Sequence, residues 1–139
     1  MKKIFILDDE PMFLDWIEDY SESLGVSIKF ITSVNKAYEI LNTSDNNEFA
    51  ALVIDLNVPT SPELDSILQQ KELVYQKYRG LFIAQQARTK GISGNKIIVY
   101  SVHDYPEIDV ICKRLNVTYI PKGRAKALKD KLFSILSTS

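Results

Sequence analysis

Four short runs of largely apolar residues punctuate the sequence, and a polar side chain follows the end of each run. Continuous apolar runs of this length predict strands that are buried on both faces of a parallel sheet. The runs are Ile4–Leu7, Ala51–Ile54, Ile97–Tyr100 and Val117–Ile120. They therefore predict an α/β fold in which helices cover both faces of the sheet.

The segments between the runs have the apolar spacing of helices. One helix is expected to open at Pro11, with Phe13 on its apolar face and Gly25 at its end, and another follows the possible cap Ser33. Further helices follow Pro106 and carry Leu128, Leu132 and Ile135, while Ile28 and Phe30 alternate with polar neighbours as an additional strand. Five strand–helix units with right-handed crossovers give a doubly wound five-stranded parallel sheet of order 2-1-3-4-5, the flavodoxin-like arrangement.

The segment from Thr60 to Lys90 is unusually long for a connection between two strands. Its apolar spacing predicts that most of it is helical. Ser61-Pro62-Glu63 has the features of a helix start, with serine at the cap and proline in the first turn. We expect Gly80 to hinge the helix, so that the fold carries an extended segment before or within its third helix.

Composition favours one cytoplasmic domain that binds other proteins. Lys and Arg total 17 against 18 Asp and Glu, so the near-zero net charge gives no electrostatic reason to expect nucleic acid or a membrane surface as a partner. The single cysteine, Cys112, cannot form an internal disulfide, and its apolar helical face predicts a core position. No stretch approaches the roughly 20 apolar residues that span a bilayer.

The polar residues after the strands are expected to meet, because ligands of open α/β sheets bind beyond the carboxyl ends of the strands. They are Asp8, Asp9, Asp55, Ser101 and Lys122. Clustered carboxylates repel one another unless a cation is shared among them. Mg²⁺ accepts such oxygen ligands, and a backbone carbonyl near Asn57 is a further candidate ligand.

This set of residues fits phosphoryl transfer. Asp55 follows a central strand and is a candidate nucleophile toward phosphorus, with the negative charge offset by the metal and by Lys122. The Ser101 hydroxyl is a candidate donor to a phosphoryl oxygen.

The motifs at the strand ends resemble those of the receiver domain of two-component response regulators. The matching segments are Phe5–Pro11, Val53–Pro59, Val99–Ser101 and Tyr119–Lys122. The resemblance extends over nearly the whole chain, since the four motifs occur in the family's order at four strand ends. It implies a single receiver domain over residues 1–139, with no output domain in that span.

The resemblance also implies a role for each site residue. Asp55 corresponds to the phosphoacceptor, Asp8 and Asp9 to the acidic pair that binds Mg²⁺ together with Asp55 and the Asn57 carbonyl, Ser101 to the switch hydroxyl, Lys122 to the phosphate-binding lysine and Tyr119 to the switch aromatic. The expected function is to take a phosphoryl group from a sensor histidine kinase or a phosphotransfer protein and to present a changed surface to a downstream protein target. Such a domain catalyses only its own phosphorylation and dephosphorylation.

Two features depart from the family pattern. Lys122 is followed by Gly123, where the family usually has proline. The interval from Asp55 to Ser101 is longer than usual, and we place the extra residues at approximately 60–78, ahead of Arg79-Gly80-Leu81, which resembles the start of the family's third helix.

Other interpretations stay open at this point. The chain could be a pseudo-receiver that signals without phosphate, and the two departures favour that hypothesis. It could instead be a small phosphatase with an aspartyl nucleophile, although Asn57 stands where such an enzyme ordinarily has a second acid. Tyr119 could be a half-buried aromatic residue without a switching role, and His103 is expected to be a solvated loop residue more often than a site residue.

Overall fold

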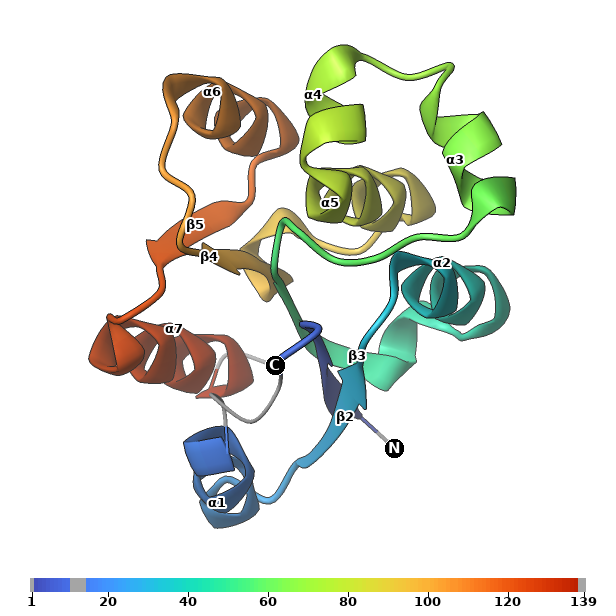
Figure 1. Ribbon diagram of the computed structural model, residues 1–139. Helices are drawn as coiled ribbons and strands as arrows, with labels where there is room; N and C mark the ends of the chain where they lie inside the picture. Colours follow the sequence, from blue (N-terminus) through green and yellow to red (C-terminus); the bar gives the residue numbers. More distant parts are fainter. Residues whose placement is uncertain (1, 11–14, 138–139) are drawn as a thin grey trace.

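A parallel sheet forms the centre of the fold. The structure, a computed structural model, describes residues 2–10 and 15–137. All five strands are parallel, in the order β2-β1-β3-β4-β5 (Figure 1). They are β1 (Lys3–Leu7), β2 (Ser27–Ile31), β3 (Phe49–Ile54), β4 (Ile97–Ser101) and β5 (Thr118–Pro121). The predicted doubly wound sheet of order 2-1-3-4-5 is confirmed.

Helices cover both faces of this sheet. In Figure 1, α1 and α7 lie on one side, and α2, α5 and α6 lie on the other. The helices are α1 (Asp15–Ser23), α2 (Val34–Thr43), α3 (Pro62–Leu68), α4 (Leu73–Lys77), α5 (Arg79–Lys90), α6 (Pro106–Leu115) and α7 (Ala125–Ser137), with short 3₁₀ turns η2 (Asn46–Glu48) and η3 (Gly94–Lys96). None of the helices in the described part of the chain has the length and apolar character needed to cross a membrane.

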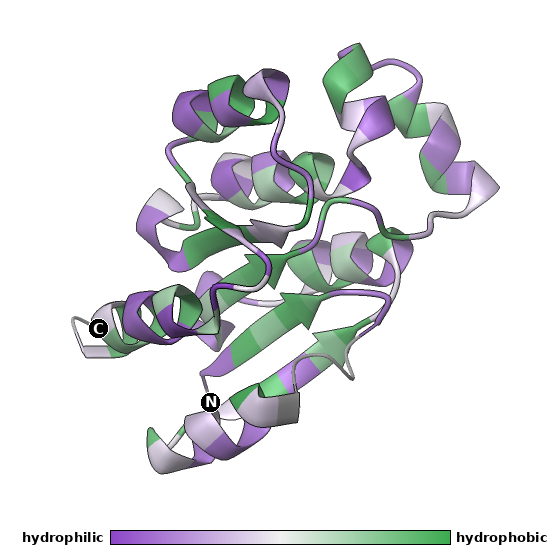
Figure 2. Cartoon of the chain, turned by 60° about the vertical axis from the view of Figure 1, so that its left-hand side comes forward, coloured by the Kyte–Doolittle hydropathy of each residue, from purple (hydrophilic) through white to green (hydrophobic). Residues whose placement is uncertain are grey.

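The strands contribute alternate side chains to two separate cores, because successive residues of a strand face opposite sides of the sheet. On β3, Leu52 and Ile54 belong to the core beneath α2, α5 and α6. Ala51 and Val53 belong to the core beneath α1 and α7. This two-sided burial explains why the central strands are continuously apolar in sequence, and Figure 2 shows them as a hydrophobic centre between helices of mixed hydropathy.

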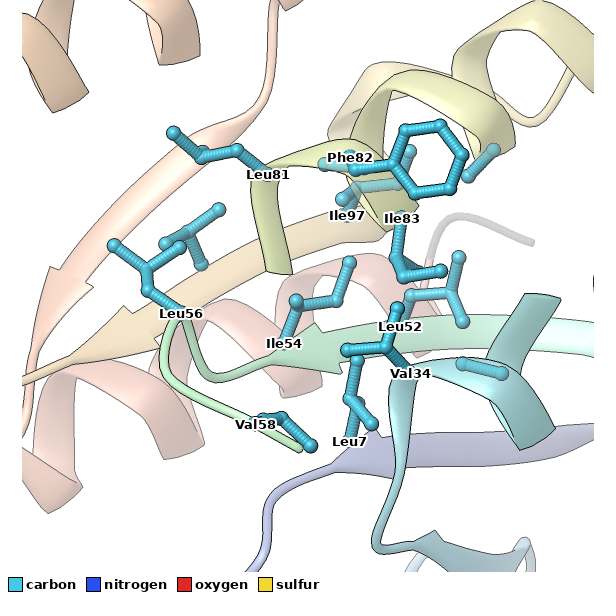
Figure 3. Close-up of a cluster of buried hydrophobic side chains, with 14 of the residues drawn as sticks. Leu7, Val34, Leu52, Ile54, Leu56, Val58, Leu81, Phe82, Ile83 and Ile97 are labelled. Atoms are coloured by element: carbon cyan, nitrogen blue, oxygen red, sulfur yellow. The ribbon is translucent and has the colours of Figure 1, made fainter. Parts of the chain in front are cut away.

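The first of these cores extends beyond the end of β3 toward the site. Leu56 and Val58 are fully buried and pack with Leu7, Val34 and neighbouring residues (Figure 3). Alternate residues after the strand are therefore anchored in the core. The residues between them, Asp55 and Asn57, both line a cleft at the carboxyl edge of the sheet.

Most helix boundaries agree with the sequence prediction. The Ser33 hydroxyl caps α2 by accepting a hydrogen bond from the Lys36 amide, at 3.2 Å. Pro106 opens α6, where Cys112 is buried as expected. The residues of the predicted helix start at Pro11 and Phe13 lie outside the described residues.

The extended segment differs from the prediction in one respect. It forms three helices, α3, α4 and α5, and the break before α5 falls at Tyr78, so the prediction of a hinge at Gly80 is wrong. Gly80 lies in the first turn of α5, where an added Cβ would stand 2.0 Å from the Asp55 carbonyl oxygen. A glycine is needed there because the helix start approaches the backbone of β3's end, a contact between distant segments that local sequence does not reveal.

Candidate functional site

Two acids stand at the carboxyl ends of adjacent strands, where hydrogen bonds fix their backbone. The Asp55 amide donates to the Leu7 carbonyl at 2.8 Å, and the Asp8 amide donates to the Ile31 carbonyl at 2.9 Å. The parallel ladder thus continues one residue past β1 and past β3. The register of the sheet therefore sets how the two carboxylates face each other.

Three carboxylates and one ammonium group converge at this edge. Asp8, Asp9 and Asp55 each offer an oxygen, and these oxygens lie within 4.8 Å of one another. The Lys122 ammonium nitrogen lies 2.9 Å from Asp8 Oδ2 and 3.2 Å from Asp55 Oδ2. Asp8 and Asp55 are buried, whereas Asp9 is exposed. The structure thus brings together four of the predicted site residues.

The two buried carboxylates are held in matching ways. One oxygen of each accepts a backbone amide: Asp55 Oδ1 from Leu56 at 2.8 Å, and Asp8 Oδ1 from Glu10 at 2.8 Å. The second oxygen of each faces Lys122. Both side chains are therefore fixed in orientation by backbone and lysine contacts.

Burial and neighbouring charges shift the pKa values of Asp55 and Lys122. Burial raises the pKa of Asp55, an effect that the Lys122 charge opposes and the nearby Asp8 charge reinforces. The pKa of Lys122 is also raised: burial acts to lower it, but hydrogen bonding to Asp8 and the charges of both carboxylates outweigh burial. Lys122 therefore stays positively charged, and its charge offsets the repulsion between the carboxylates of Asp8 and Asp55.

The donor set fits a hard divalent cation. Three carboxylate groups with oxygens this close supply the ligands that Mg²⁺ prefers. Asn57 lines the same cleft, so its backbone carbonyl stays a predicted ligand.

The acids open into a cleft of about 670 Å³ at the edge of the sheet. This volume has room for waters and a phosphoryl group beside the carboxylates. The cleft is lined by Asp8, Asp9, Glu10, Trp16, Asp55, Asn57, Tyr100, Val102, His103, Lys122, Gly123 and Ala125. Trp16, the only tryptophan, is thus placed to report on the site by fluorescence.

Ser101 lies beside the cleft but does not line it. It is the last residue of β4 and is fully buried. Its hydroxyl accepts a hydrogen bond from the His103 amide at 3.1 Å, and its carbonyl accepts one from the Lys122 amide at 2.9 Å. In the described part of the chain the Ser101 hydroxyl thus contacts its own loop, and its hydrogen is not committed to a carboxylate.

Tyr119 joins β5 to the loop after β4. Its hydroxyl donates to the carbonyls of Ser101, at 3.3 Å, and of His103. Burial raises the pKa of this hydroxyl, so it stays a neutral donor at physiological pH. Tyr119 is partly buried against the core, and its switching role stays a prediction.

His103 is part of the site wall, contrary to the expectation of a solvated loop residue. It is half-buried, and its Nε2 lies 2.6 Å from the side-chain nitrogen of Asn57. Its backbone accepts from Tyr119 and donates to Ser101. The sequence signal that could have found it is its place two positions beyond Ser101, in the loop that lines the cleft.

Gly123 occupies the position where the family usually has proline. Its φ is +95°, a conformation that glycine adopts without strain, and it lines the cleft. The chain thus turns after Lys122 through a glycine-specific conformation, and Lys122 still reaches both carboxylates.

Comparison of the sequence with known families and curated proteins finds no match.

Solved structures, in contrast, match over nearly the full length. The receiver domain of Francisella response regulator 1452 has a TM-score of 0.69 at 17% identity, covering 99% of this chain and 98% of that one. A CheY-like receiver domain protein from Methanospirillum hungatei JF-1 has a TM-score of 0.65 at 17% identity, covering 100% and 99%. The BeF3-activated receiver domain of Klebsiella pneumoniae RstA has a TM-score of 0.68 at 15% identity, covering 97% and 98%.

These matches define the class of fold. The chain has the CheY-like, flavodoxin-type fold of response-regulator receiver domains, and the resemblance stated from the motifs is confirmed at the level of the fold. Receiver domains are signalling domains rather than classical enzymes. The three-acid cluster lies at the carboxyl edge of this fold.

Proposed function

We propose that the chain is a phosphoacceptor receiver domain, formed by residues 1–139, in a two-component system or phosphorelay. The observation that carries the proposal is the placement of Lys122 between Asp8 and Asp55, at 2.9 and 3.2 Å, on a receiver fold. A buried acid pair bridged by a lysine is costly to build for stability alone. Its presence at the ligand-binding edge of the sheet supports a chemical role.

Asp55 is the proposed phosphoacceptor. An oxygen of its carboxylate forms a bond to phosphorus as the bond from phosphorus to the histidine nitrogen of the donor breaks; the donor ring, protonated on its other nitrogen, keeps the electron pair and leaves as neutral imidazole. With acetyl phosphate as donor, the phosphorus–oxygen bond breaks and acetate leaves. Water later attacks phosphorus, which releases inorganic phosphate and restores the Asp55 carboxylate.

Asp8, Asp9 and Asp55, with the Asn57 carbonyl, would hold Mg²⁺. When bound, the metal neutralises charge on the transferring phosphoryl oxygens and orients them. Lys122 provides a second positive charge beside the attacking carboxylate.

Ser101 and Tyr119 are the proposed switch residues. In the phosphorylated state the Ser101 hydroxyl, which accepts a hydrogen bond from the His103 amide, would turn to donate its hydrogen to a phosphoryl oxygen in a charge-assisted hydrogen bond. Tyr119, which is hydrogen-bonded to this loop, would follow its movement and change the surface of α6, β5 and α7.

A sensor histidine kinase or phosphotransfer protein is the proposed phosphodonor, and a downstream protein is the proposed target. Both proteins would meet the domain in the cytoplasm. The domain catalyses only its own phosphorylation and dephosphorylation. The phosphatase alternative gains no support, since the amide of Asn57 lies where a second acid would be needed and contacts His103.

Phosphate uptake from acetyl phosphate tests the proposal. With Mg²⁺ present, we expect the wild-type protein to acquire acid-stable, base-labile phosphate and the Asp55→Asn variant to acquire none. Asp19→Asn, which changes an exposed acid on α1, serves as the matched control and should be labelled like wild type. EDTA should abolish labelling of wild type and control alike.

The pseudo-receiver hypothesis predicts a different result. It requires that wild type fails to take up phosphate at any Mg²⁺ concentration. Labelling of Asp55→Asn as fast as wild type would instead indicate a different phosphoacceptor. Either result would contradict the phosphoacceptor assignment. A Mg²⁺ titration followed by Trp16 emission, which we expect to saturate in wild type, tests the metal site separately.

A further inference from the structure

The inserted segment, residues 60–78, buries Leu64, Leu68 and Tyr75 in the core beneath α2, α5 and α6, and polar contacts attach it to the rest of the fold at two places. We call this segment the strap. At its beginning, the Ser61 amide donates to Asn35 Oδ1 at the start of α2, at 2.6 Å. Near its end, side chains of α4 and its flanks contact α6. Figure 1 shows α3 and α4 outside the layer formed by α2 and α5, so the strap crosses that layer from α2 to α6.

Two ion pairs fasten the strap to α6. Glu72 meets Arg114 near the end of α6 at 3.0 Å, and Lys77 meets Glu107 near its beginning at 3.1 Å. Tyrosine hydroxyls reinforce both pairs, since Tyr78 donates to Glu107 at 3.1 Å and Arg114 donates to the Tyr75 hydroxyl at 3.2 Å. The strap thus contacts both ends of one helix.

The same attachment contacts the loop between β4 and α6. The Tyr78 ring is buried and lies 5.9 Å from the His103 ring and 6.2 Å from the Tyr105 ring. The Lys77 ammonium lies 5.9 Å above the Tyr105 ring. The loop is therefore packed from outside by the strap and bonded from inside to Tyr119.

This loop is hydrogen-bonded to Ser101, the last residue of β4. The His103 amide donates to the Ser101 hydroxyl, so a turn of that side chain toward a phosphoryl oxygen, as we propose for phosphorylation, either breaks this hydrogen bond or moves the loop with it. A contact made in one of two arrangements stabilises that arrangement and opposes conversion to the other. The strap contacts His103, Tyr105 and α6 in the arrangement that the structure shows, and these contacts therefore stabilise that arrangement.

We infer that the strap is a built-in restraint: by clamping α6 and the loop 102–105 it stabilises the arrangement in which Ser101 bonds His103, and so sets how readily phosphorylation switches the domain. This inference rests on the proposed function. Residues Lys77 and Glu72 are positioning residues, which act on the site through His103 and α6 rather than by touching the phosphoryl group.

The test compares the response to beryllofluoride, a phosphoryl mimic, in the presence of Mg²⁺. The double variant Lys77→Met, Glu72→Gln removes a charge from each ion pair, keeps the length of the Glu72 side chain, shortens that of Lys77 by the ammonium nitrogen alone and leaves α6 unchanged in sequence. The control Lys36→Met breaks an exposed Lys–Glu pair of 3.4 Å within α2, far from the loop in sequence. Trp16 emission reports the half-saturating beryllofluoride concentration.

We expect the double variant to respond at a beryllofluoride concentration lower than wild type by roughly twofold to tenfold, since each exposed ion pair contributes up to about fivefold to an equilibrium constant. The control and Lys77→Arg, which keeps the charge, should match wild type within about twofold. Amide hydrogen exchange of residues 102–115 without beryllofluoride should be faster in the double variant only.

The outcomes separate this inference from the proposed function. If wild type responds to beryllofluoride and the double variant has the same or a higher half-saturating concentration, the strap is not a restraint, although the receiver function stands. If wild type gives no response at all, the proposed function fails and this inference fails with it. Equal hydrogen exchange in wild type and the double variant also overturns the restraint.

Discussion

The site and the strap both contain acids beside lysines, yet their environments affect the charged form in opposite directions. Asp55 is buried at the site, and burial raises the pKa of its carboxyl. Glu107 is exposed where the strap meets α6, and hydrogen bonds from Lys77 and then Tyr78 lower the pKa of its carboxyl. The fold thus holds the Asp55 charge at a cost in stability, whereas the Glu107 charge, on α6 beside the strap, contributes to stability.

This contrast suggests which contacts serve chemistry and which serve structure. A buried acid that is destabilised by its surroundings is typical of a functional site, because selection for activity tolerates the loss of stability there. Exposed pairs such as Lys77 with Glu107 are individually weak and can be removed without unfolding the protein. We therefore expect the acids of the site to be rigidly held at a cost in stability, and the ion pairs of the strap to tolerate substitution.

The largest expected effect comes from Gly80, which lies in α5 just after the strap and contacts the backbone of Asp55 at the site. Gly80→Ala should cost more than about 3 kcal/mol of unfolding free energy, because the new Cβ would meet the Asp55 carbonyl oxygen at 2.0 Å. Urea unfolding measures the loss.

A second glycine provides the comparison. Gly25 has a positive φ of +75°, but a Cβ added there would meet no atom within 4 Å, so Gly25→Ala should cost only about 1–2 kcal/mol. Equal losses for the two variants would show that the close approach of α5 to the end of β3 is not needed.

An intermediate effect is expected at Asp55 itself. Asp55→Asn should raise the unfolding free energy at pH 7 by about 1 kcal/mol in the absence of divalent cations, because it removes a buried charge next to Asp8. Lys122 keeps its contact with Asp8 at 2.9 Å. The exposed control Asp19→Asn should leave stability within about 0.5 kcal/mol of wild type. A destabilised Asp55→Asn variant would contradict the cost that we assign to the site.

The smallest effect concerns the strap and pH. The pKa of Glu107 lies below its ordinary value of 4.5, so its charged form stabilises the fold above that value, and the contribution is lost as pH falls through the lowered pKa. Glu107→Gln should therefore be slightly less stable than wild type at pH 7. The difference should vanish in strong acid. Chemical unfolding at both pH values checks this, and a difference that grows toward low pH would refute it.

The sheet and the acid cluster could be predicted from sequence because both depend on local patterns. A strand buried on both faces must be apolar throughout, so Ala51–Ile54 is visible as a run and Asp55 is visible as the residue that ends it. The order of the strands then follows from crossover rules. Lys122 joins the cluster for the same reason, since it follows β5 directly.

The contacts of the strap and of the loop after β4 were harder to predict from the sequence, because they join residues that are distant in the chain. Nothing near Glu72 in sequence indicates that it pairs with Arg114, and nothing near Gly80 indicates the Asp55 carbonyl. The position of His103 against Asn57 likewise results from packing between two loops. Local periodicity predicted helix in this segment but not where the helix breaks.

The Gly80 amide donates a hydrogen bond to the Leu56 carbonyl at 3.0 Å, and this bond joins the two ends of the segment that contains the strap. The chain leaves the sheet and returns to it at nearly the same point. Lengthening such a loop at its tip, at residues 69–71, adds little entropic penalty and does not pull on the strand register. That tip is a natural position for grafting an epitope or a reporter domain while the three clustered acids keep their spacing.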